Sequence, residues 1–178
     1  MGATGWMRVL WLAGATLAVG SVAAEELSSF VAAQDGAQSC WSRDYSAEHL
    51  AAHPDQLVTA MRFTMRFDTE VNDNPDFYSF RLEADLRGGQ SGRAFGYCSE
   101  FEGAVSCAVE CDGGGVGVAQ AADGKVLLDL TRYGFIRMAG SCGSDEADGF
   151  GLEAGLDDKQ FLLSPATGKA CKPLGPPD

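Results

Sequence analysis

Hydrophobic and polar residues alternate along two stretches in the first half of the chain. In "AMRFTMRF", residues 60–67, methionine or phenylalanine occupies every second position, with arginine or threonine between. "YSFRLEADLR", residues 78–87, repeats this period of two with polar and charged residues on one face. Such alternation predicts two half-buried strands of an antiparallel sheet. The turn-rich "TEVNDNPD", residues 69–76, predicts the hairpin loop that joins them.

The two alternating stretches also predict which residues oppose each other. Apolar faces must meet, so an odd-numbered residue of the first strand opposes an even-numbered residue of the second. Two of the three candidate registers place an arginine of the first strand opposite Arg81, and like charges face to face cost up to about 1 kcal/mol. The third register pairs Phe63 with Leu82 and Arg62 with Glu83, and we predict it for this reason.

Shorter strand candidates follow, nearly all separated by glycine or acidic turns. They are residues 94–99, 104–110, 115–120, 125–131, 133–138, 150–154 and 160–163. Many short strands with regular turns predict a mostly β fold, in which an antiparallel meander forms a small barrel or a sandwich. One short N-terminal helix is expected over "AEHLAAH", residues 47–53, capped by Ser46 and stopped by Pro54.

The first 24 residues have the pattern of a secretory signal peptide. Arg8 precedes an apolar run, and Val22 and Ala24 stand three and one residues before the expected cleavage. The alternative is a membrane anchor, but the run is short, contains glycine and meets two glutamates at once. We therefore predict an exported protein, periplasmic or secreted, that is cleaved near Ala24.

Cleavage changes the charge and length only slightly. Removing 24 of the 178 residues leaves 154, and Arg8 is the one charged side chain that is lost. The remaining 12 basic and 25 acidic side chains give a net charge of −13, against −12 for the whole chain. Such an acidic protein repels phosphate backbones, so no nucleic-acid partner is expected. No later segment is apolar enough to span a bilayer. We expect a loosely structured lead segment at 25–39, a single β domain at 40–171 and a frayed tail at 172–178.

All six cysteines lie beyond the expected cleavage point, and an even number in an exported chain predicts three disulfides. If residues 104–110 form a strand that continues to Cys111, Cys107 and Cys111 lie about 13 Å apart, too far for a bond. Cys98 faces Cys107 if Glu102–Gly103 forms the hairpin turn. We predict the pairs Cys98–Cys107, Cys111–Cys142 and Cys40–Cys171. A zinc site or a redox pair is disfavoured, because three residues separate Cys107 from Cys111 where two are usual.

Other candidate sites carry weaker signals. His49 and His53 share a helix face, as metal ligands do, but no third ligand is identifiable, so we expect neither a metal nor a cofactor. The acidic loops 69–76 and 143–153 offer oxygen ligands for calcium without matching an EF-hand, and we interpret them as solvated turns. Ser91 lies in no nucleophile elbow and no acid–base pair stands out, so we expect no catalytic residue.

Three segments resemble an uncharacterised family of small exported bacterial proteins that carry a CxxxCDGGG motif. They are "HPDQLVTAMRF", "CAVECDGGGVGV" and "FLLSPATGKAC", with the motif in the second. The resemblance covers most of the chain after residue 24. No activity is established for that family, so the resemblance implies export and assigns no site residues.

These observations favour a non-enzymatic binding module. A β-barrel holds a small apolar ligand at its mouth when apolar side chains line it. The candidate lining residues are Met61, Phe63, Met65, Phe67, Tyr78, Phe80 and Leu82, although we favour the simpler interpretation that they fill a core. The alternative function is an envelope inhibitor or partner-binding protein for a basic target, which an acidic surface suits. An acidic metal-handling protein using His49 and His53 is the third, less favoured interpretation.

Overall fold

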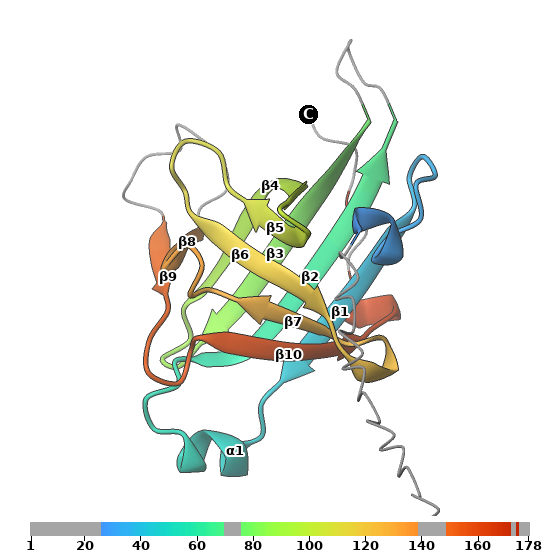
Figure 1. Ribbon diagram of the computed structural model, residues 1–178. Coiled ribbons are helices and arrows are strands. Elements are labelled where there is room, and N and C mark those ends of the chain that lie inside the picture. The colour runs from blue at the N-terminus through green and yellow to red at the C-terminus, as the bar shows by residue number, and fades with distance from the viewer. Residues whose placement is uncertain (1–25, 70–75, 139–148, 172–173, 175–178) are drawn as a thin grey trace, which may run out of the picture.

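Eight strands form a closed antiparallel barrel in the computed structural model, which describes residues 26–69, 76–138, 149–171 and 174 (Figure 1). Around the barrel the strands follow the order β1-β10-β7-β6-β5-β4-β3-β2. They are β1 (Gln38–Asp44), β2 (Val58–Asp68), β3 (Phe77–Leu86), β4 (Ser91–Phe101), β5 (Ala104–Ala108), β6 (Gly115–Gln120), β7 (Val126–Asp129) and β10 (Gln160–Pro165). The predicted mostly β fold is confirmed, and it is a barrel.

Smaller elements complete the fold. They are the two-stranded sheet of β8 (Phe135–Met138) and β9 (Phe150–Glu153), the helix α1 (Ala47–Ala52), and the 3-10 turns η1 (Leu27–Ser29), η2 (Ala122–Gly124) and η4 (Gly168–Ala170). Helix α1 begins as predicted, because the side chain of Ser46 accepts a hydrogen bond from the backbone N–H of His49. Ile136 of β8 and Leu152 of β9 are buried and extend the barrel core sideways.

The register predicted for the first hairpin is confirmed. Phe63 lies opposite Leu82, and Arg62 lies opposite Glu83. The pairing shifts at the start of β2, between Val58 and Ala60, where the strand carries an irregularity. The observed register is the one in which apolar faces meet and like charges stay apart.

Several sequence-based boundaries are wrong. The strands predicted at 125–131 and 133–138 are shorter, Val126–Asp129 and Phe135–Met138. The strand predicted at 104–110 ends at Ala108, because Cys111 and Asp112 adopt positive φ angles of 57° and 58° and the chain turns there. Strand β1 was not predicted at all; it begins at Gln38, inside the expected lead segment, and Trp41 is its one large apolar residue. The lead segment also packs more closely than expected, with Leu27, Phe30 and Val31 buried.

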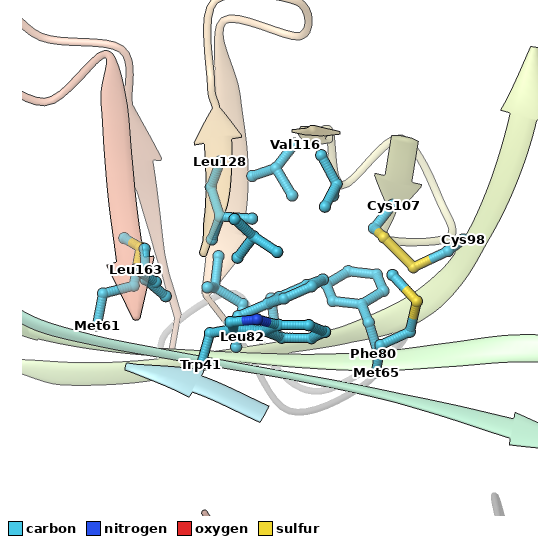
Figure 2. Packing of buried hydrophobic residues seen from close by; sticks show 14 of the residues in the cluster. Trp41, Met61, Met65, Phe80, Leu82, Cys98, Cys107, Val116, Leu128 and Leu163 are labelled. Atoms are coloured by element: carbon cyan, nitrogen blue, oxygen red, sulfur yellow. A yellow bond between two sulfur atoms is a disulfide. The ribbon is translucent and has the colours of Figure 1, made fainter. Parts of the chain in front are cut away.

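The centre of the barrel is filled by its own side chains (Figure 2). Phe63, Phe80 and Phe161 are at most 1% exposed, and Met65 and Leu82 are fully buried beside them. Strands β4 and β5 also approach closely, since a Cβ added at Gly96 would lie 2.0 Å from the carbonyl oxygen of Ala108. The candidate lining residues thus form the core, as the favoured interpretation expected, except for Tyr78, which is half-buried.

Two disulfides fasten the barrel, and both are predicted pairs. Cys98–Cys107 joins β4 to β5 with a Cα–Cα distance of 3.9 Å, and Cys40–Cys171 joins β1 to the chain after η4 with a Cα–Cα distance of 6.0 Å. Cys111 is also disulfide-bonded, while Cys142, its predicted partner, lies outside the described residues. Such bonds are typical of oxidising compartments outside the cytoplasm.

The predicted signal peptide and most of the predicted tail lie outside the described residues. Within the tail, Leu174 is buried, and its backbone N–H donates to Oε1 of Gln38 at 3.1 Å. Across the described ranges, no helix combines the length and the apolar character that crossing a membrane requires.

Candidate functional site

The barrel closes through a short seam between β1 and β10. Only two residue pairs join these strands, Trp41 with Pro165 and Ser42 with Ser164, whereas β1 pairs with β2 along its whole length. Beyond Pro165 the chain leaves the barrel, and the backbone N–H of Ala166 donates to the carbonyl of Cys40 at 2.9 Å. The first residues of β1 therefore border a gap in the wall of the barrel.

A cavity of about 600 Å³ opens at this gap, and we call it the seam cavity. Its lining comes from the end of η1 with the next residue, from β1, β2, the end of β6, η2 and β7, and from the last residue of β10 with the chain that follows it. Its lining residues are Ser29, Phe30, Gln38, Ser39, Cys40, Trp41, Thr64, Gln120, Ala121, Gly124, Lys125, Val126, Pro165, Ala166, Thr167 and Cys171. The Cys40–Cys171 disulfide thus forms part of the cavity wall.

Trp41 occupies a fixed position in this wall. Its indole N–H donates to the carbonyl of Gly124 at 2.9 Å, and its ring lies 6.0 Å from the ring of Phe63, centroid to centroid. The side chain is 6% exposed, and its ring packs on the barrel core (Figure 2). A buried tryptophan whose N–H is satisfied is held rigidly, so Trp41 gives this wall a fixed shape.

The charge in the seam cavity is sparse. Among the described residues that line it, Lys125 is the only one with a charged side chain, and its Nζ lies 3.7 Å from Oδ2 of Asp123. No carboxylate or imidazole belongs to this described lining, so an acid–base pair is absent from it. The arrangement can enclose a small molecule beside the hydroxyls of Ser39 and Thr167, while the amides of Gln38 and Gln120 hydrogen-bond to Leu174 and Ser29.

Sequence reasoning missed the seam cavity, because its residues come from segments far apart in the chain. Thr64 belongs to the polar face of the alternating strand, yet it is 3% exposed and lines the cavity. One signal was available: the predicted Cys40–Cys171 pair already brings the two ends of the domain together at this place.

His49 and His53 are brought together, but not as converging ligands. Their rings stack with centroids 4.4 Å apart and an interplanar angle of 26°. Nε2 of His49 lies 3.0 Å from Oε1 of Gln56, and Nδ1 of His53 lies 3.9 Å from a carboxylate oxygen of Asp157. Lone pairs of stacked rings lie in nearly parallel planes and do not meet at one ion. No group of three or more potential ligands gathers among the described residues, and the absence of metal binding stays a prediction.

The Ser91 hydroxyl is hydrogen-bonded to a carboxylate. Its hydroxyl donates to Oδ1 of Asp85 at 2.7 Å, and Arg62 lies 3.1 Å from the other carboxylate oxygen. The Ser91 hydrogen bond, followed by the contacts with Arg62, lowers the pKa of Asp85 against the opposing effect of desolvation. The acidic loops considered for calcium fall mostly outside the described residues, at 70–75 and 143–148.

We predict that Ser91→Ala raises the pKa of Asp85 toward its ordinary value, because the strongest cause of the lowering is removed. A carboxyl whose folded pKa is lowered adds stability above its unfolded pKa and loses it as the pH falls through the folded pKa. The variant should therefore lose stability near neutral pH and match the wild type in strong acid. Carboxyl ¹³C NMR titration measures the pKa directly, and an unchanged value would contradict this assignment.

Neither protein-family models, nor curated proteins, nor solved structures match this chain. The resemblance to a family of small exported proteins therefore stays a prediction. The fold itself defines a disulfide-fastened, eight-stranded antiparallel barrel with a cavity at its seam.

Proposed function

We propose that this protein is a non-enzymatic, exported binding module that holds a small, largely apolar ligand in the seam cavity. The observation that carries the proposal is the lining: the accessible Ala121, Pro165 and Ala166 form apolar walls over the buried Phe30 and Trp41, with hydroxyl groups beside them. Ligand sites are typically concave, mostly apolar and equipped with a few polar groups, and they measure about 300–1,000 Å³. The seam cavity, at about 600 Å³, has this size and this chemistry.

The chemistry of the lining also selects the kind of ligand. Lys125 is half-buried and already lies near the Asp123 carboxylate, so the cavity presents little uncompensated charge. A strongly charged ligand would lose its hydration without finding a partner. An uncharged molecule with an apolar body and one or two hydrogen-bonding groups fits best. The described lining holds no acid–base pair, which favours binding over catalysis.

Titration with the neutral apolar dye N-phenyl-1-naphthylamine tests this proposal. The full chain should be expressed, exported and purified from the periplasm. Dye emission excited through tryptophan should then saturate at one molecule per chain, because Trp41 lines the cavity. Trp6 and Trp11 lie in the predicted signal peptide, and Trp41→Phe should abolish the energy transfer.

A pair of matched variants locates the dye. Ala166→Phe places a ring in the cavity and should weaken dye binding by at least about tenfold, a change of about 1.4 kcal/mol. Ala51→Phe makes the same substitution at an exposed position of α1 and should leave binding unchanged. Thermal unfolding confirms that both variants fold. Undiminished binding to Ala166→Phe, or no saturable binding to the wild type, would refute the proposal.

A second candidate function rests on the β4–β5 hairpin. The Cys98–Cys107 bond braces it, and Phe101 at its tip is 61% exposed beside Glu102. A rigid acidic loop with an exposed aromatic side chain suits a basic protein, such as a cationic hydrolase of the envelope. Biolayer interferometry with lysozyme as the basic probe should show salt-sensitive binding that Phe101→Ala abolishes. An unchanged signal in that variant would remove this candidate.

A further inference from the structure

A second hollow lies at the other end of the β1–β10 seam, beside helix α1. It is a shallow groove of about 410 Å³, which we call the helix groove. Its lining residues are Arg43, Tyr45, His49, His53, Gln56, Leu156, Asp157, Lys159, Gln160 and Leu162. None of these residues lines the seam cavity, so the helix groove is a separate site.

One wall of the helix groove is a continuous stack of side chains. The guanidinium carbon of Arg43 lies 5.2 Å from the centre of the Tyr45 ring, and that ring stacks on His49 at 4.8 Å. His49 in turn stacks on His53 at 4.4 Å. Cation–π contact and ring stacking hold these side chains in place. Burial raises the pKa of Tyr45, so its phenol stays neutral and adds no negative charge to the wall.

The groove lining also has an apolar part that is exposed. Leu156 is 74% exposed and Leu162 is 40% exposed, and both line the groove. Exposed leucines are common one at a time, but two in one concave site next to aromatic rings indicate a surface that takes an apolar chain. The exposure of both leucines supplies the apolar part of a ligand site.

The helix groove also concentrates positive charge on an acidic protein. Arg43 and Lys159 line it, on a chain with a formal net charge of −12. Asp157 is the one carboxylate of the described lining, and its Oδ2 lies 3.9 Å from Nδ1 of His53. The buried neighbour Asp158 accepts hydrogen bonds from the backbone N–H groups of Leu57 and Val58, and its charge also acts on Tyr45 in the groove wall.

We propose that the helix groove binds a small amphiphilic carboxylate, with the carboxylate at Arg43 and Lys159 and the alkyl chain against Leu156 and Leu162. Arginine and lysine side chains form charge-assisted hydrogen bonds with a carboxylate. Leucine side chains bury the apolar surface of an alkyl chain. The acidic remainder of the protein repels anions over long range. Binding of the carboxylate therefore depends on these local contacts. The proposed ligand is negatively charged, whereas the ligand expected in the seam cavity is uncharged.

Isothermal titration calorimetry with decanoate, using the exported protein purified from the periplasm, tests the proposal. We expect saturable binding of one decanoate per chain. Decanol, a neutral molecule with the same chain length, should bind at least about tenfold more weakly because it lacks the carboxylate. The double variant Arg43→Gln/Lys159→Gln should weaken decanoate by a similar factor while leaving decanol unchanged.

Two controls separate this site from the rest of the protein. Arg93→Gln removes an exposed cation that lies over Phe95 on β4, outside the helix groove, and should bind decanoate normally. Ala166→Phe should also bind decanoate normally, so a failure of the seam proposal leaves this one intact. The proposal is overturned if decanoate does not bind, if decanol binds as tightly, if the double variant binds like the wild type, or if Ala166→Phe abolishes decanoate binding.

Discussion

Replacing Cys40 and Cys171 together by alanine is expected to lower the free energy of unfolding by about 3–5 kcal/mol. The bond spans a sequence separation of 131 residues and restricts the unfolded chain accordingly. It also lies beside the seam, where two residue pairs alone join β1 to β10. Urea unfolding followed by circular dichroism measures the change.

The matched control is the double variant Cys98→Ala/Cys107→Ala. That bond closes a loop of only nine residues between adjacent strands, so the same loop-closure argument gives a smaller loss of about 2–3 kcal/mol. A larger loss in this variant than in Cys40→Ala/Cys171→Ala would show that the seam bond does not dominate the covalent stabilisation.

Phe63→Ala is the second variant with a large expected effect, a loss of about 3–5 kcal/mol. Phe63 is fully buried, and its ring centroid lies 6.0 Å from those of both Trp41 and Phe80. Truncation removes buried apolar surface and leaves a cavity between these rings. Urea unfolding again supplies the measurement.

Phe101→Ala makes the same chemical change at an exposed site and provides the comparison. Its side chain is 61% exposed at the β4–β5 turn, so the loss should be about 0.5 kcal/mol or less. Similar losses in the two variants would contradict the assignment of Phe63 to the centre of the core.

The first hairpin was predictable because two features of its sequence, the alternation of apolar residues and the placement of charges, favour the same register. Every second residue of β2 and β3 is apolar, and the charges between them exclude the competing registers, so Phe63 meets Leu82 as expected. Strand β1 offers no such pattern, because Trp41 is its one large apolar side chain. Its place in the barrel depends on pairing with β2, which is a long-range contact that a local pattern does not reveal.

The sites were less predictable than the fold. Met65 and Phe80, considered as the lining of a ligand site, fill the centre, which is the interpretation that the sequence favoured. The seam cavity lies where β1 and β10 pair over only two residues, and the end of a strand's pairing depends on long-range contacts that a local pattern does not reveal. The cysteines carried the most information, since the predicted Cys40–Cys171 pair marks one wall of that cavity.

Native mass spectrometry of the protein exported to the periplasm and purified without denaturation tests the central claim most directly. We predict that the wild type and Ala51→Phe retain one small molecule per chain. Ala166→Phe, whose new ring occupies the seam cavity, should show the mass of the bare polypeptide. A bare wild-type chain, or the same retained molecule in Ala166→Phe, would contradict the assignment of the seam cavity as the ligand site.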